Sequence, residues 1–100
     1  MTDRELLELA AKAAGVDARR LAHAWPDRFD DEQWNPLTDD GDEARLEAAL
    51  QLNVEWHPLT QSVQVGTAAI ACSENYRKDA QAARRRAGVR AAAEIGRTMK

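Results

Sequence analysis

The chain has 100 residues, of which 44% are hydrophobic and 31% are charged, and its formal net charge is −3. This length predicts a single domain over residues 1–100, and this composition excludes wholesale disorder. The single cysteine, Cys72, excludes an internal disulfide and a cysteine-based zinc cluster. No apolar run is long enough to span a membrane, and the first residues do not form a signal peptide. We therefore expect a cytoplasmic protein that does not bind membranes.

Charge is divided unevenly along the chain. Residues 1–72 contain 14 acidic and 6 basic side chains, whereas residues 73–100 contain 3 acidic and 8 basic ones. Such a division indicates either a charged binding surface at one end or two parts of one fold that attract each other.

The opening residues carry helix signals. Thr2 and Glu5 have the spacing of a capping box, in which hydroxyl and carboxylate each accept from a free amide. Apolar residues then recur at helical spacing as far as Gly15, which favours a left-handed stop. We predict a helix over residues 3–14.

A short helix and a long polar loop are expected next. Residues 18–24 follow a capping aspartate and end before a proline, and the residue before a proline disfavours helical angles. Residues 26–41 are rich in Asp, Asn, Pro and Gly, which predicts a loop. We expect three side chains, Phe29, Trp34 and Leu37, to pin this loop to the fold.

Two further helices are predicted. Asp40 and Glu43 have capping-box spacing, which indicates a central helix over residues 42–52. Ser73 is a suitable cap for a last helix over residues 74–98, with a largely alanine apolar face. Gly88, inside this helix, either permits close backbone packing or allows a bend. The alanine face could also pack against a second copy, so a monomer or a homodimer is expected.

Between these helices the apolar period changes to two, which indicates strands. Val54 and Trp56 point to one face, and a turn over residues 58–61 leads to a partner strand over residues 62–70. In that strand Val63 and Val65 point inward, so a β-hairpin is predicted. A lone hairpin is marginal and must pack on helices. The expected fold is therefore α+β, with N-terminal helices, a central helix, a β-hairpin and a long C-terminal helix.

Patterns typical of catalysis and metal binding are weak in this sequence. No local signature connects Cys72 with either histidine, His23 or His57, as a nucleophile and base would require. Residues 39–42 resemble a calcium loop, but alignment with the EF-hand pattern places Pro36 at the first ligand position. We predict no enzyme activity, no metal site and no cofactor.

Two surfaces are candidates for binding a macromolecule. The acidic loop over residues 27–43 combines carboxylates with aromatic side chains, which suit a protein interface. Its predicted partner-binding residues are Phe29, Asp30, Asp31, Trp34, Asp39 and Asp40. The alternative is nucleic-acid binding by the basic last helix, since a run of arginines can neutralise phosphates. Its predicted residues are Arg84, Arg85, Arg86 and Arg90. These arginines could instead form a solvated face partly paired with the acidic part of the chain.

The stretch Trp34-Asn35-Pro36-Leu37-Thr38-Asp39-Asp40-Gly41-Asp42, followed by Ala44-Arg45-Leu46, resembles the Trp-x-Pro-Leu-x-Asp-Asp-Gly-Asp-Ala motif of small phage and prophage proteins of unknown function. Residues 5–15 and 89–97 look like the same group, which is similar in layout to NinX-like proteins. The resemblance covers about half the chain and supplies no catalytic residues. It implies a phage accessory protein in a bacterial cytoplasm. Such a protein would bind a host protein and modulate or inhibit a defence complex that handles nucleic acid.

Overall fold

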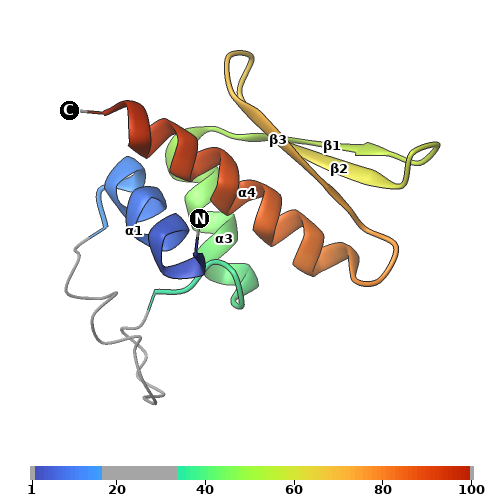
Figure 1. Cartoon of the computed structure of the whole chain (residues 1–100), viewed down its shortest axis with the longest axis horizontal. Coiled ribbons are helices and arrows are strands. Elements are labelled where there is room, and N and C mark those ends of the chain that lie inside the picture. The colour runs from blue at the N-terminus through green and yellow to red at the C-terminus, as the bar shows by residue number, and fades with distance from the viewer. Residues whose placement is uncertain (1, 17–33, 100) are drawn as a thin grey trace.

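A computed structural model describes residues 2–16 and 34–99, and these form a helical layer packed on a small sheet (Figure 1). The predicted α+β class is confirmed. The predicted helix over residues 18–24 lies outside the described residues, as do Phe29, Asp30 and Asp31. The described elements, in chain order, are α1 (Asp3–Ala14), α3 (Asp40–Leu50), β1 (Asn53–His57), β2 (Ser62–Gly66), β3 (Ala71–Asn75) and α4 (Ala80–Thr98).

Local signals define α1, whose predicted bounds are confirmed. The Thr2 hydroxyl accepts from the Glu5 amide at 3.2 Å, and the Glu5 carboxylate accepts from the Thr2 amide at 3.3 Å. Gly15 ends the helix with a left-handed φ of 74°, which glycine adopts without steric cost.

The central helix begins two residues earlier than predicted, because its N-cap is Asp39 and not Asp40. The Asp39 carboxylate accepts from the amides of Gly41 and Asp42, at 2.8 and 3.4 Å. The predicted capping box is wrong because the Glu43 side chain is buried and packs toward α4. The helix ends at Leu50, where the next residue takes a left-handed φ.

The predicted hairpin is confirmed as β1 and β2, with Val54 opposite Val65 and Trp56 opposite Val63, but β2 ends at Gly66 and not at residue 70 as predicted. The prediction for the next segment is wrong. Residues 71–75 form a third strand, in which Ser73 pairs with Gln64, and α4 begins only at Ala80. The side chain of Asp79, rather than that of Ser73, caps this helix. The three strands form an antiparallel sheet in the order β1-β2-β3.

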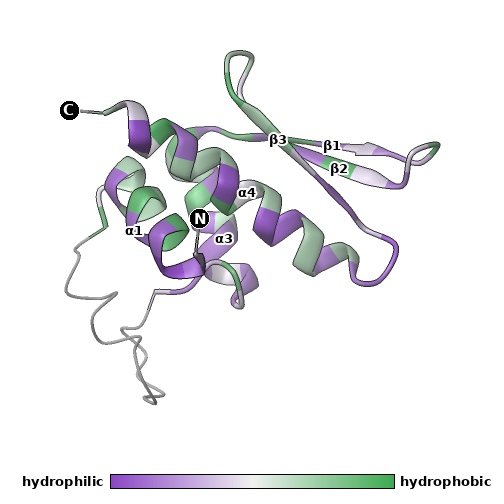
Figure 2. Ribbon diagram, viewed as in Figure 1, coloured by the Kyte–Doolittle hydropathy of each residue, from purple (hydrophilic) through white to green (hydrophobic). Residues whose placement is uncertain are grey.

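Helix α4 is the centre of the fold and contributes to both hydrophobic clusters. It packs against α1 and α3 on one side and against β2 and β3 on the other (Figure 1). Val89 and two alanines join the cluster with α1, whereas Ala83 and Ala87 join the cluster with the sheet. Along α4, hydrophilic and hydrophobic segments alternate (Figure 2). The small alanine side chains of α4 allow both the neighbouring helices and the sheet to pack close to it.

The two glycines inside α4 lie at tight contacts. A Cβ at Gly88 would lie 2.9 Å from a carboxylate oxygen of Glu43, and a Cβ at Gly96 would overlap the backbone carbonyl of Leu9. The structure therefore has close packing at Gly88, which was one of the two predicted alternatives. The buried alanine face of α4 is already occupied by the rest of the fold, so it is not available to a second copy.

Candidate functional site

The described part of the predicted acidic surface has a structural role. Trp34 is only 3% exposed and belongs to the cluster with α1, so the prediction that it pins the loop to the fold is confirmed, whereas its burial does not fit the predicted contact with a partner. Asp39 is the cap of α3, and the Asp40 carboxylate pairs with Arg85 at 2.6 Å. These three residues therefore stabilise the fold.

The distinctive motif around Trp34 forms a closed hydrogen-bond network at the start of α3. The Asn35 carbonyl accepts from the amides of Thr38 and Asp39, at 3.1 and 3.0 Å. The buried Asp42 carboxylate accepts from the Asn35 amide at 2.9 Å and from the Arg45 guanidinium at 2.7 Å. The motif thus has a physical explanation as a helix-starting unit.

The arginines proposed for nucleic-acid binding are all paired with carboxylates or carbonyls of the protein itself. Arg84 binds both oxygens of Glu47, at 2.9 and 2.8 Å. Three further pairs tie α4 to neighbouring elements: Arg85 with Asp40, Arg86 with Asp3, and Arg90 with Glu74. Oppositely charged parts of the chain therefore attract each other within the fold, as one of the two interpretations of the uneven charge division predicted. A phosphate would have to compete with these carboxylates.

A buried carboxyl pair lies where α3 meets α4. Glu43 is 3% exposed, and its Oε2 atom has no hydrogen-bond partner among the described residues. Burial, together with hydrogen bonding and repulsion from Glu47, raises the pKa of Glu43 to about 9. Burial also opposes ionisation of Glu47, but hydrogen bonds from Arg84 and Glu43 outweigh it and lower the Glu47 pKa. Glu43 is therefore protonated at neutral pH, whereas Glu47 carries the charge that Arg84 neutralises.

This arrangement predicts a pH-dependent stability. Because the folded-state pKa of Glu43 lies above its unfolded value, the folded state binds more protons between about pH 4.5 and 9. The free energy of unfolding should therefore fall as pH rises through this window, by up to about 1.4 kcal/mol per pH unit from this group. The Glu43→Gln variant should lose that part of the slope in urea unfolding measured from pH 5 to 9.

The exposed Glu8 of α1 supplies the matched control. The variant Glu8→Gln should retain the wild-type slope. Equal slopes for wild type and Glu43→Gln would show that Glu43 ionises normally in the folded protein.

The uncovered face of the sheet was not predicted as a site. Side chains that share the face of Val63 and Val65 point toward α4, as the ion pair between Glu74 and Arg90 also shows. The opposite face is small and polar, and no described helix packs across it (Figure 1). Its residues are Asn53, Glu55, His57, Ser62, Gln64, Gly66, Ala71, Ser73 and Asn75. The alternation of polar and apolar residues in the strands is the sequence signal from which this polar face could have been predicted.

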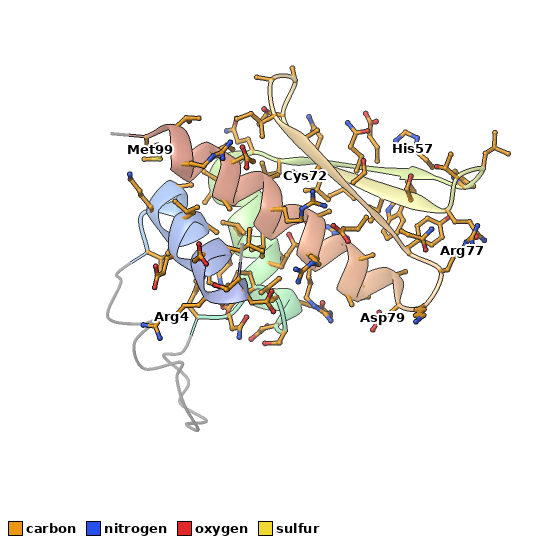
Figure 3. All side chains as sticks on the ribbon, viewed as in Figure 1. Arg4, His57, Cys72, Arg77, Asp79 and Met99 are labelled. Atoms are coloured by element: carbon orange, nitrogen blue, oxygen red, sulfur yellow. The ribbon has the colours of Figure 1, made fainter. Side chains whose placement is uncertain are left out.

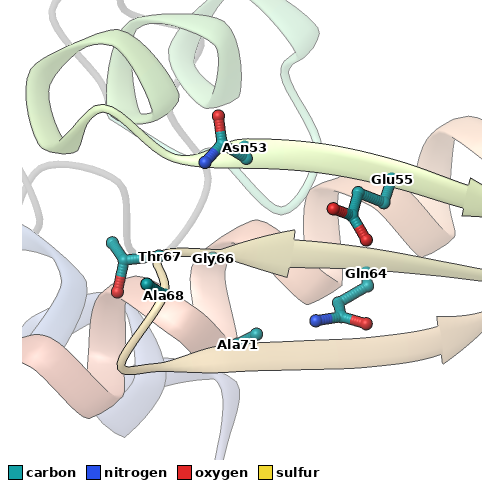
Figure 4. A pocket seen from close by; sticks show the side chains of 7 residues that line it. All are labelled: Asn53, Glu55, Gln64, Gly66, Thr67, Ala68 and Ala71. Carbon is teal, nitrogen blue, oxygen red and sulfur yellow. The ribbon is translucent and has the colours of Figure 1, made fainter.

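A hollow of about 350 Å³ lies on this open face, beside the loop that joins β2 to β3. Figure 4 shows the side chains of Glu55 on β1 and Gln64 on the neighbouring strand β2, with Thr67 just beyond the end of β2. The other lining residues are Asn53, Gly66, Ala68 and Ala71. Three side chains thus present carbonyl or carboxylate oxygens, namely Glu55, Gln64 and Asn53. The hollow can therefore accept hydrogen bonds from a donor-rich group.

Strand β1 extends beyond the cover of the helices. Trp56, predicted to share one strand face with Val54, is 43% exposed and makes an edge-on contact with Tyr76, with ring centroids 5.3 Å apart. It does share the inner face with Val63, but α4 packs against β2 and β3 rather than β1. At the turn after β1, Leu59 is fully exposed. Among the described residues, the exposed tryptophan therefore lies in the hairpin and is not Trp34.

The described residues with catalytic side chains do not converge. Cys72 faces α4, and burial raises the pKa of its thiol. His57 lies on the opposite sheet face, nearer the hairpin end (Figure 3). Among residues 2–16 and 34–99, no three His, Cys, Asp or Glu side chains are grouped to hold a metal ion. In this part of the chain no helix is both long and apolar enough to cross a bilayer.

No protein-family model, curated protein or solved structure matches this chain.

Proposed function

We propose that the protein acts by binding another protein, and that the open sheet face with its β1 edge is the contact surface. The observation that carries this proposal is the one-sided cover of the sheet, which leaves β1 with exposed Trp56 on one face and the polar hollow on the other. Exposed aromatic side chains beside polar groups are typical of protein interfaces. The absence of convergent catalytic side chains among the described residues agrees with a binding role.

The phage-like motif suggests the setting of this binding. In that setting the protein is an accessory protein that binds a host protein in the bacterial cytoplasm. It modulates or inhibits a host complex that handles nucleic acid. The motif itself forms the start of α3, so the specificity for the partner resides elsewhere, on the sheet.

Nucleic-acid binding by α4 is the weaker alternative. Arg84 and Arg85 have side chains only 33% and 16% exposed, and both are engaged by carboxylates of α3. Phosphate contacts by these arginines would cost the ion pairs that join α4 to α3.

An affinity pull-down from bacterial lysate tests the proposal, with the tagged full chain as bait and with or without nuclease. We expect a protein retained in stoichiometric amount, and unaffected by nuclease. Its retention should fall for the hairpin variant Trp56→Ala, whereas the control variant Arg86→Gln at an α1–α4 ion pair should retain it fully. Retained nucleic acid that disappears from the Arg86→Gln bait would replace this proposal with the nucleic-acid alternative.

A further inference from the structure

We infer that the edge of β1 accepts an extended segment of the partner as an added strand, and that this segment alternates basic and apolar side chains. This inference rests on the proposed function and names the binding mode and the partner's chemistry. The added strand would pair with the backbone of Asn53–His57, place its basic side chains over the polar hollow, and place its apolar side chains beside Val54 and Trp56.

The backbone of β1 is available for this pairing. In the sheet order β1-β2-β3, β1 has β2 on one side and no described strand on the other. Its register with β2 is continuous from Asn53 to His57, without a bulge. Proteins commonly protect such edges with bulges, prolines or lysines, and residues 53–57 contain none of these. Half of the amide and carbonyl groups of an edge strand point away from its neighbour and can pair with another chain.

The outer face of the strand selects for positive charge. Glu55 is the only carboxylate that lines the hollow, and Asn53 and Gln64 are the lining residues with side-chain amides (Figure 4). No lysine or arginine lines the hollow. A guanidinium or ammonium group over Glu55 would gain an ion pair and amide hydrogen bonds, whereas a carboxylate would be repelled.

The inner face of the strand selects for apolar groups. Val54 is half-buried against the cluster formed with the sheet, and Trp56 next to it on the same face is 43% exposed. Side chains of an added strand alternate between the two faces, as those of β1 do. Apolar residues at alternate positions of the partner would therefore cover Trp56 and extend this cluster.

A capped pentapeptide of alternating arginine and valine is the probe, because five extended residues match the length of β1. Titration of the full-length protein, followed by backbone amide NMR shifts at low salt, should show changes concentrated at Asn53–His57. The same peptide with N-methylated valines should lose binding, since it cannot form the main-chain ladder. The Glu55→Lys variant should bind the arginine peptide about fivefold more weakly, and a matched glutamate–valine peptide better than wild type does.

Each outcome separates the binding mode from the proposed function. Equal binding of the N-methylated peptide, or equal affinity of Glu55→Lys, would overturn strand addition, as would shifts located away from β1. In the lysate pull-down, a nuclease-resistant partner retained equally by wild type and Glu55→Lys would also overturn it while leaving the proposed function intact. If the pull-down retained no protein, the proposed function would be refuted. The peptide titration would then decide on its own whether the edge of β1 accepts an added strand.

Discussion

Replacing Trp34 with alanine is expected to lower the free energy of unfolding by about 4 kcal/mol. Its side chain is almost completely buried between α1, α3 and α4, in contact with the cluster that contains Leu7, Leu46 and Val89. Removal of an indole from such a site loses its transfer free energy and leaves a cavity that rigid helices fill poorly. Urea unfolding followed by far-ultraviolet circular dichroism would measure the change in midpoint.

The matched control is Trp56→Ala, which removes the same side chain from a half-exposed position. We expect it to cost about 1 kcal/mol, because less apolar area returns to water and the contact with Tyr76 is at an edge. Similar losses for the two variants would mean that Trp34 does not occupy the core.

Replacing Gly96 with alanine is expected to destabilise the protein by about 3 kcal/mol. The added methyl group would overlap the backbone carbonyl of Leu9, where α1 and α4 are in close contact. Alanine favours a helix over glycine by about 1 kcal/mol, but this gain is smaller than the cost of moving one helix away from the other. Thermal unfolding should show a clearly lower midpoint.

Gly41→Ala makes the same chemical change in another helix and is the control. Its new methyl group would meet only side-chain atoms of Asp39 and Arg45, the nearest at 3.2 Å, and these can shift. We expect a change in stability within about 1 kcal/mol. A stabilised Gly96→Ala variant would be incompatible with the close approach of α1 and α4.

Elements defined by local signals could be predicted from the sequence. The capping box and terminal glycine of α1 act within a few residues, so the predicted bounds agree with the structure. The hairpin follows from strict alternation on both sides of a polar turn, which also defines its register.

The segment between β2 and α4 could not be predicted because its structure depends on distant contacts. Residues 71–75 have little strand propensity, and they are extended because β2 provides a partner along their whole length. Ser73 and Asp79 are both good caps locally. The cap at Asp79 prevails because the preceding residues already belong to the sheet.

The candidate site depended on exposure, which the sequence alone does not specify. Trp34 was predicted as a contact residue in a polar loop, but the structure buries it and instead exposes much of Trp56. The arginines of α4 were recognised as a charged group, but their pairing with α1, α3 and β3 depends on tertiary contacts.

The central position of α4 has a consequence for synthesis on the ribosome. Both hydrophobic clusters include residues of α4, and this helix is translated after every other described element. Until residues 80–98 emerge, α1 and α3 lack most of their packing partners, and the inner face of the sheet remains exposed to water. The nascent chain therefore exposes apolar surfaces to chaperones until α4 has emerged, and the described elements should complete their packing only after α4 leaves the exit tunnel.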